Sequence, residues 1–412
     1  MSRPQRYQVV GTGVDTIKVS AVGKLREEVI AVLDALQQQA IAQRDERRQS
    51  GEALVDSHWK LDGEPVQIRA HGGGKGQWRW TGECPSARFD FGLGKLNGIG
   101  CQVRLASPFL WRRGYRDAWD RTETFLRRLF QKDTWFQTSE IHLCADVAGL
   151  AVDQLQEKAF VTRSQVKRWH LDDALVMHLA TRSPRIEGMP TVEVVRRYRE
   201  RETLSFSLSA AHSVMVYNKP REIRFKSRDK AWFADIWRAN GWNGHDPVTR
   251  VEARYGRAML HELGEQKQEG EKVGWHGLET VAETFAWLDG MWAYTTQDWL
   301  RHTLPTSLSS ERWRTSPWWQ VVQGAVFERE QAEPLQRTKQ RNFQEERMLA
   351  ALLGYVESWS AWRIGEQKLS EDILLEDALA DVLDRAGEHY AHKGTVFLEE
   401  VARKRKRLGF AG

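Results

Sequence analysis

The chain has few of the residues that crosslink a protein or carry it across a membrane. Its three cysteines, Cys84, Cys101 and Cys144, form no Cys-x-x-Cys pair, which argues against a zinc ribbon or a disulfide framework. No run of about 18 apolar residues exists, so we expect no membrane-spanning helix and no membrane partner. The first residues also lack the apolar segment of a secretory signal. The sequence therefore predicts a cytoplasmic protein.

The charge of the chain is unevenly distributed. Residues 181–257 carry 16 Lys or Arg against 9 Asp or Glu, whereas residues 366–389 carry 2 against 8. A concentrated basic segment is what a polyanion-binding surface needs, although solvated helix faces are often basic as well. With 41% hydrophobic and 28% charged residues, the composition excludes collagen-like and fully disordered chains. We therefore expect a folded protein with a nucleic acid as its partner.

Strand and helix patterns alternate over the first 260 residues, whereas the remainder shows mainly helical spacing. This order predicts an α+β fold, with an antiparallel sheet that has helices on one face, followed by an all-α C-terminal region. At 412 residues, two or three domains are expected. We place an N-terminal α/β region with a DNA-binding surface at 1–135, a catalytic core at 136–302, and a helical region at 303–412. Helices are expected at 164–171, 278–302, 335–353 and 371–388.

The segment 140–146 combines an apolar and a polar face. Because side chains alternate along a strand, Glu140, His142 and Asp146 project to one side and Ile141 and Leu143 to the other. Two carboxylates and a neutral imidazole suit Mg²⁺ or Mn²⁺. The alternative is an exposed edge strand with no ligand role.

Two further segments carry groups that act on phosphates. Tyr217 ends an apolar strand two residues before Lys219, and a nearby lysine lowers the pKa of a phenol and contacts phosphate. A tyrosine buried at a strand end is the alternative. In the segment 249–255, Arg250, Glu252 and Arg254 share one strand face, which indicates either an ion-pair ladder or a metal or phosphate site.

In this order, the three segments resemble those of the rolling-circle replication initiators of the Rep-trans group, which plasmids, phages and integrative elements carry. The similarity extends over residues 10–355. The matching pieces are residues 13–16, 140–149, 202–207, 214–223 and 247–260, with linking pieces at 107–114 and 232–242.

The resemblance implies a ferredoxin-like sheet related to the HUH endonucleases and a tyrosine that nicks one DNA strand. It implies a divalent metal, Mg²⁺ or Mn²⁺, that polarises the scissile phosphate, with Glu140, His142, Asp146 and Glu252 as the pool of ligands. Tyr217 would be the nucleophile, and Lys219 would assist the phosphate. Candidate nucleic-acid contacts are Arg196, Arg197, Arg199, Arg221, Arg250 and Arg254, together with Arg403, Lys404 and Arg405 from a run of five cations that is otherwise a solvated tail.

The sequence departs from the family pattern at two places. It has no His-x-His pair, so His142 would serve alone, and the strand at 203–207 lacks a tyrosine. The nucleophile is then Tyr217, Tyr198 or absent. We therefore keep three hypotheses: a nickase that starts rolling-circle replication, a DNA-binding relative that has lost the chemistry, and an RNA-binding module that stacks bases on Trp78 and Trp80. A helicase or host replication protein, and a second copy of the chain, remain open as partners.

Overall fold

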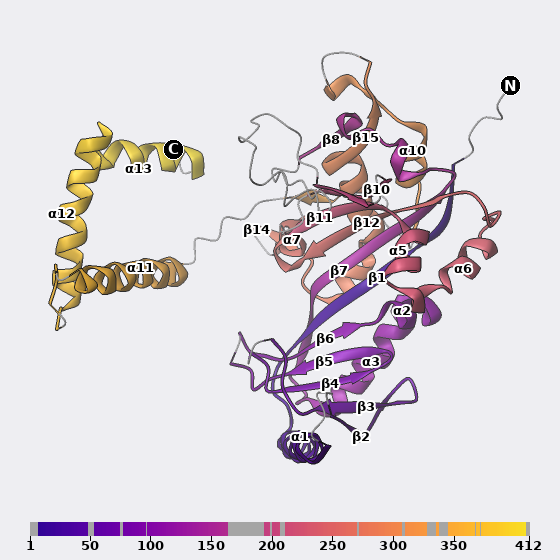
Figure 1. Ribbon diagram of the computed structural model, residues 1–412, viewed down its shortest axis with the longest axis horizontal. Coiled ribbons are helices and arrows are strands. Elements are labelled where there is room, and N and C mark those ends of the chain that lie inside the picture. Colours follow the sequence, from indigo (N-terminus) through magenta and orange to yellow (C-terminus); the bar gives the residue numbers. More distant parts are fainter. Residues whose placement is uncertain are drawn as a thin grey trace. The chain divides into compact units, whose positions relative to one another are not determined.

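An eleven-stranded antiparallel sheet organises most of the chain in the computed structural model (Figure 1). The structure describes residues 7–47, 53–74, 77–95, 97–163, 193–197, 200–206, 211–269, 272–306, 310–327, 335–337, 345–366, 368–370 and 372–408. The chain forms two units, Met1–Lys339 and Gln340–Gly412. Within the described ranges, no helix has the length and apolar character needed to cross a membrane.

The order of strands in the large sheet is β2-β3-β4-β5-β6-β1-β7-β12-β11-β10-β9, and every neighbouring pair is antiparallel. The strands are β1 (Gln8–Val22), β2 (Leu54–Leu61), β3 (Glu64–Arg69), β4 (Trp80–Cys84), β5 (Ala87–Phe91), β6 (Ile99–Leu105), β7 (Trp135–Ala148), β9 (Glu193–Arg197), β10 (Glu200–Phe206), β11 (His212–Asn218) and β12 (Val248–Gly256). The expected α+β class with an antiparallel sheet is confirmed. The carboxylate-bearing strands β1, β7 and β12 are far apart in the sequence but adjacent in the sheet, as a single site formed by their polar faces requires.

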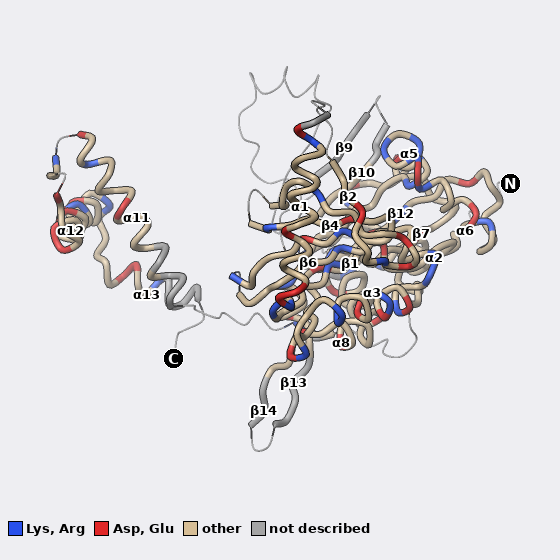
Figure 2. The backbone as a smooth tube through the Cα atoms, turned by 90° about the horizontal axis from the view of Figure 1, so that it is seen from below, with Lys and Arg blue, Asp and Glu red and all other residues tan. Residues whose placement is uncertain are grey.

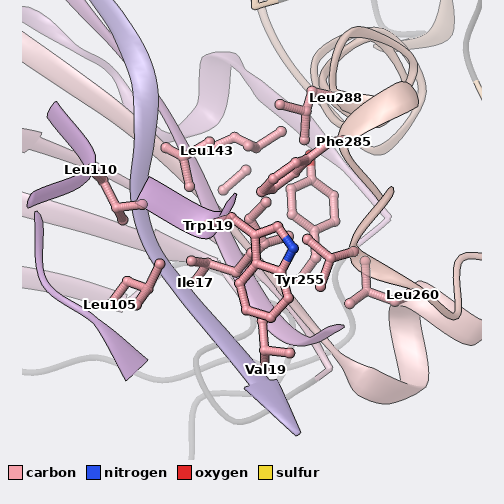
Figure 3. Close-up of a cluster of buried hydrophobic side chains, with 14 of the residues drawn as sticks. Ile17, Val19, Leu105, Leu110, Trp119, Leu143, Tyr255, Leu260, Phe285 and Leu288 are labelled. Carbon is pink, nitrogen blue, oxygen red and sulfur yellow. The ribbon is translucent and has the colours of Figure 1, made fainter. Parts of the chain in front are cut away.

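Alternation along the central strands divides the sheet into an apolar and a polar face. Ile17 and Val19 of β1 and Leu143 of β7 are fully buried on the apolar face. Figure 3 shows them meeting Trp119 and Phe285, which come from two helices laid over this face. Burying this surface is the main favourable term in folding the sheet.

Helices lie on both faces of the sheet, which corrects the expectation of one face. The apolar face packs against α3 and α7–α9. The helices α2, α5 and α6 lie over the polar face of β1, β7 and β12. They bury charged side chains there, and buried charges must be paired with one another. The helices of this unit are α1 (Glu27–Arg47), α2 (Ser107–Arg113), α3 (Tyr115–Leu129), α5 (Lys219–Phe225), α6 (Phe233–Ala239), α7 (Arg257–Glu262), α8 (Val281–Ala286), α9 (Leu288–Ala293) and α10 (Pro317–Gln323).

The expected helix at 278–302 is interrupted, and this prediction is wrong in part. A capping box at Thr280 starts α8, α9 follows, a π-helical segment covers Tyr294–Trp299, and the chain then enters strand β15 (Leu300–Leu304). Most residues from Leu288 to Thr296 are buried, including polar ones such as Asp289 and Thr295, so the helical period of the apolar residues could not mark the end of the helix. The expected helix at 164–171 lies outside the described residues.

Two small sheets accompany the large one. The strands β8 (Phe160–Thr162) and β16 (Arg314–Thr315) flank β15, and β14 (Lys272–Gly277), β13 (Leu263–Glu269) and β17 (Gln336–Arg337) form the other sheet.

The second unit is helical, as expected, but the region from 303 that was predicted to be all-α also contains the short strands β16 and β17 before this unit begins. It contains α11 (Glu345–Gly365), α12 (Leu375–Lys393) and α13 (Phe397–Leu408). Asp381 of α12 joins the first two helices by accepting hydrogen bonds from Trp359 at 2.6 Å and from Arg363 at 2.6 Å. The boundary between units falls at 339/340 and not at 303, and the expected division at 135/136 lies at the start of β7, inside the sheet.

Candidate functional site

The polar face of the central strands brings together the charged side chains of β1, β7 and β12. His142 of β7 lies opposite Arg254 of β12 on one side and opposite Thr16 of β1 on the other. Glu140, two residues earlier on the same face, lies opposite Lys18. Directly opposed residues on antiparallel strands project to the same face and their side chains interact.

An irregularity in β1 adds a carboxylate to this face. Val14 pairs with Leu143 and Thr16 pairs with His142, so Asp15 is an extra residue between two paired positions. Bulges of this kind redirect a side chain and occur often beside functional sites. Asp15 accordingly turns toward the polar face, where it accepts a hydrogen bond from Ser107 of α2 at 3.0 Å.

A chain of hydrogen bonds links the candidate nucleophile to the acidic strand. The Tyr217 hydroxyl donates to Glu252 Oε2 at 2.7 Å. The other oxygen of Glu252 lies 3.0 Å from His142 Nδ1, and His142 Nε2 lies 3.1 Å from Glu140. A carboxylate only accepts hydrogen bonds, so both contacts form together only when both ring nitrogens carry hydrogen. This geometry makes His142 an imidazolium between two carboxylates.

The electrostatics of the chain agree with this assignment. Burial alone would lower the pKa of His142, but its hydrogen bonds to Glu140 and Glu252 raise it above the usual value. Burial would raise the pKa of Glu140, but His142 and Lys18 hold it well below its usual range. Lys18 Nζ lies 2.9 Å from Glu140, and Arg254 donates to its other oxygen at 2.9 Å. Glu140 is therefore a carboxylate held by three cationic groups.

Tyr217 is an un-ionised phenol in this environment. Burial raises its pKa well above the usual value, and the nearby negative charge of Glu252 adds to the increase. The side chain is 8% exposed, beside a pocket of about 30 Å³ that Arg221 and Lys226 help to line. Lys219 does not reverse the effect, since its ammonium faces Glu222 at 2.7 Å. The expectation that Lys219 lowers the pKa of Tyr217 is therefore wrong.

A second cluster lies deeper, under the aromatic cover of α2 and α6. Arg250 donates to both oxygens of Asp146, at 2.6 and 2.8 Å, and to Asp15 at 2.9 Å. Trp237 donates to Asp146 at 2.8 Å. The ring of Phe233 lies 4.4 Å from the Arg250 guanidinium. Every oxygen of Asp146 is thus engaged.

This second cluster changes the roles expected for two residues. Arg250 and Asp146 are both fully buried, so they support the site from within and do not reach a surface that a nucleic acid could contact. The predicted ladder along β12 is replaced by pairs across strands, since Arg250 and Arg254 bind carboxylates of β7 and β1. Burial alone would raise the pKa of Asp15, but Arg250, Lys230 and Lys219 hold it well below its usual range.

Glu252 is the carboxylate best suited to a divalent cation. Of the site carboxylates, Glu252 alone forms no ion pair with Lys or Arg among the described residues, and its charged partner is His142. The carboxylates of Glu252 and Glu140 fit Mn²⁺ or Mg²⁺ by donor type, and His142 would join them only after losing the proton that makes it an imidazolium. In this structure these side chains bond to one another, and no group of three His, Cys, Asp or Glu in the described ranges is arranged to hold a metal ion.

The remaining candidate contacts belong to β9, α5 and α13. Arg196 and Arg197 lie on β9, while Tyr198 and Arg199 fall outside the described residues. Arg221 lies on α5, where its backbone N–H donates to Asn218 at 3.0 Å. In the second unit, the predicted solvated tail is part of α13; Arg403 pairs there with Glu400 at 3.1 Å, and the backbone of α13 also includes Lys404 and Arg405. Of these residues, Arg221 lines the small pocket beside Tyr217.

The two tryptophans proposed for base stacking are inside the protein. Trp80 is fully buried and Trp78 is 7% exposed. The indole of Trp80 donates to Asp34 of α1 at 3.0 Å, and Arg79 binds the same carboxylate at 2.8 Å. A base cannot stack on either ring, so the RNA hypothesis loses the residues that motivated it.

Sequence reasoning missed Asp15, Lys18, Ser107 and Trp237 as parts of the site. For Asp15, the available signal was a carboxylate beside the apolar residues of a strand, but strict alternation places it on the same face as Ile17 and Val19, which is the wrong one. Trp237 lies on the apolar face of its helix, and nothing in that pattern marks its indole as a donor to Asp146. A comparison of the chain with protein-family models gives no match, and no curated protein is similar to it.

Proposed function

We propose that the protein nicks one DNA strand with Tyr217 as the nucleophile, as a replication initiator of a plasmid or other mobile element. The observation that carries the proposal is the hydrogen bond from Tyr217 to Glu252, continued through His142 to Glu140. A phenol is a weak nucleophile at neutral pH, so it needs a base within hydrogen-bond reach. Glu252 meets that requirement at 2.7 Å.

The chemistry is a transesterification at phosphorus. The Tyr217 oxygen forms a bond to the phosphorus, the bond to the 3′ oxygen breaks, and the DNA 5′ end stays attached as a phosphotyrosine. Glu252 takes the phenolic proton, and the leaving 3′ oxygen gains one, so the overall proton count is unchanged. His142 keeps Glu252 oriented and lowers its pKa against the effect of burial. No oxidant or reductant is required.

A divalent cation, if bound by Glu252 and Glu140, with His142 as a further ligand once that ring has lost a proton, would supply Lewis-acid stabilisation of the phosphate charge. The chain's own residues have separate tasks. Lys18 and Arg254 hold Glu140 in place, and the buried pair of Arg250 and Asp146 fixes the spacing of β7 and β12. Fixing this spacing preserves the alignment of Tyr217 with Glu252.

One observation favours a second candidate, a DNA-binding protein without nicking activity. Tyr217 is 8% exposed, and the Lys219 ammonium lies over its ring. In that case the hydrogen-bond chain would stabilise the sheet and do no chemistry. The two candidates differ in whether a phosphate reaches the phenol.

The experiment is a covalent-capture assay. A random-sequence single-stranded DNA pool with a 3′ fluorophore is incubated with the full chain and Mn²⁺, because a 5′-phosphotyrosine adduct retains the 3′ part of the DNA. We expect a fluorescent band that resists SDS for the wild type and for Tyr198→Phe, and none for Tyr217→Phe. A band for Tyr217→Phe that is lost in Tyr198→Phe would transfer the role to Tyr198. A wild type that binds the pool but gives no band would establish the non-catalytic candidate.

A further inference from the structure

Three basic residues stand in one row across the N-terminal half of the sheet, next to the candidate site. Lys18 of β1 lies directly opposite Arg104 of β6, and Arg104 lies directly opposite Arg88 of β5. Neighbouring strands are about 4.8 Å apart, so the three side chains rise together from the polar face. Figure 2 marks the Lys and Arg positions on these strands in blue.

This row is electrostatically unfavourable within the isolated protein. Like charges directly opposite each other destabilise a sheet. Lys18 is compensated by Glu140 at 2.9 Å, and Arg88 by Asp90 at 3.2 Å. Arg104, between them, is exposed and has no hydrogen-bond or ion-pair partner among the described residues. An anion bound to the row would remove the repulsion.

Arg88 and Arg104 of this row line a groove that extends to the candidate site. Its volume is about 550 Å³, which is ample for a segment of a polymeric ligand. Thr16 and Ser107 line its inner end, and they contact the site directly, because Thr16 is opposite His142 and Ser107 binds Asp15. Lys230 adds a further cation to the wall.

The chemistry of the lining selects for phosphates over bases. Arginine binds phosphate oxygens through two parallel N–H groups. The groove has no aromatic side chain on which a base could stack; its described lining is Thr16, Gln67, Glu83, Cys84, Pro85, Ala87, Arg88, Arg104, Leu105, Ala106, Ser107, Pro108, Asp229 and Lys230. The groove also has two acids, Glu83, which is paired with Arg69 at 2.6 Å, and Asp229. Such contacts with phosphates position a nucleic-acid strand without recognising its base sequence.

We infer that this groove, which we call the Arg104 groove, binds the phosphodiester backbone of the single strand that enters or leaves the site. The inference rests on the proposed function, since it takes DNA to be the substrate at Tyr217. It assigns the β-strands β5 and β6 a task separate from catalysis. They hold the single-stranded DNA beside the site and add affinity for DNA that does not depend on its sequence.

The test is equilibrium binding of a fluorescein-labelled 20-nucleotide oligothymidine to the full chain, followed by anisotropy between 50 and 200 mM NaCl. We expect Arg104→Gln to weaken binding about 5- to 10-fold and to reduce the slope of log affinity against log salt by about one. The matched control is Arg128→Gln, the same change at an exposed arginine of α3, over the opposite face of the sheet. This control should leave affinity and slope unchanged.

The outcomes separate the two proposals. Equal affinities for wild type and Arg104→Gln, or equal losses in Arg104→Gln and Arg128→Gln, would overturn the Arg104 groove even if Tyr217 forms its DNA adduct. A selective loss in Arg104→Gln would support the groove even if no adduct forms, and only the nicking proposal would then fail. Thermal unfolding keeps the comparison valid: Arg104 is exposed and unpartnered, so Arg104→Gln should unfold at the wild-type temperature or slightly above it.

Discussion

Tyr217 and Glu252 lie on adjacent strands, β11 and β12, in a diagonal arrangement: Tyr217 is opposite Arg250, yet its hydroxyl reaches across to Glu252 at 2.7 Å. Arg250, the residue directly opposite, has only donors and binds Asp146, so it offers the hydroxyl no acceptor. The phenol instead meets the Glu252 carboxylate, which can take its proton.

Replacing Glu252 by Gln should separate catalysis from folding. The amide is nearly the same size and can still accept the Tyr217 hydrogen bond, but it cannot take the proton. We expect the rate of adduct formation to fall about 10²- to 10⁴-fold, the range for loss of a general base, with oligothymidine affinity unchanged. Single-turnover capture on labelled DNA measures the rate. A variant that reacts as fast as the wild type would show that Glu252 is not the base.

The buried pair of Arg250 and Asp146 should be important for stability. Arg250→Leu leaves the fully buried Asp146 and the nearby Asp15 without their main counter-charge. Removing one partner of a buried ion pair costs about 3–5 kcal/mol, so we expect that loss in the free energy of unfolding by urea.

The matched control for this prediction is Arg238→Leu on α6. Arg238 is 59% exposed and pairs with Asp235, which is 80% exposed. An exposed pair contributes about 0–1 kcal/mol, so the variant should unfold close to the wild type. Similar losses in the two variants would mean that the buried cluster has no special role.

The sequence predicted the composition of the site better than its geometry. Alternation over 140–146 correctly placed Glu140, His142 and Asp146 on one face, since period 2 follows from strand geometry alone. It could not show that Asp146 would be taken by Arg250, because that pairing depends on the order and register of β7 and β12. Asp15 was missed because a bulge breaks the alternation, and a bulge depends on the neighbouring strand.

Long-range packing also explains the errors in the fold. The tryptophans at 78 and 80 have spacing typical of an exposed stacking surface, but α1 returns over this part of the sheet and buries them. Likewise, Trp299 and Leu300 continue a helical pattern, yet β15 forms there because β8 offers a partner strand. Neither partner is close in sequence.

The second unit should be dispensable for folding of the first. Among the described residues of that unit, Ala378 is the one buried apolar side chain, while large ones such as Tyr355, Trp362 and Phe397 are exposed. We expect a chain ending at Lys339 to keep the near-ultraviolet circular dichroism of the buried tryptophans and a similar unfolding temperature. It should also bind less of an apolar dye such as ANS. A loss of cooperative unfolding would contradict this prediction.

Two buried histidines should make the protein less stable in mild acid. Burial lowers the pKa of His212 to about 3 and that of His302 to about 4. His212 is enclosed by the rings of Tyr255 and Trp299 and contacts the Arg254 carbonyl oxygen at 3.0 Å. In the folded protein both rings therefore stay neutral at pH 5, whereas in the unfolded chain a histidine binds a proton below about pH 6.5.

The direction of the effect follows from proton counting. Between pH 6.5 and the pKa of each histidine in the folded protein, the unfolded state binds more protons than the folded state. The contribution of these histidines to the free energy of unfolding is therefore fully present above pH 6.5 and declines as the pH falls. Each histidine should then lower the free energy of unfolding by about 2 kcal/mol between pH 7 and pH 5. Urea unfolding across this range measures the slope. In His212→Asn, whose amide can still donate to the Arg254 carbonyl, the free energy of unfolding should fall less between pH 7 and pH 5, by about the amount expected for one histidine. An unchanged dependence on pH would mean that other groups cause the acid sensitivity.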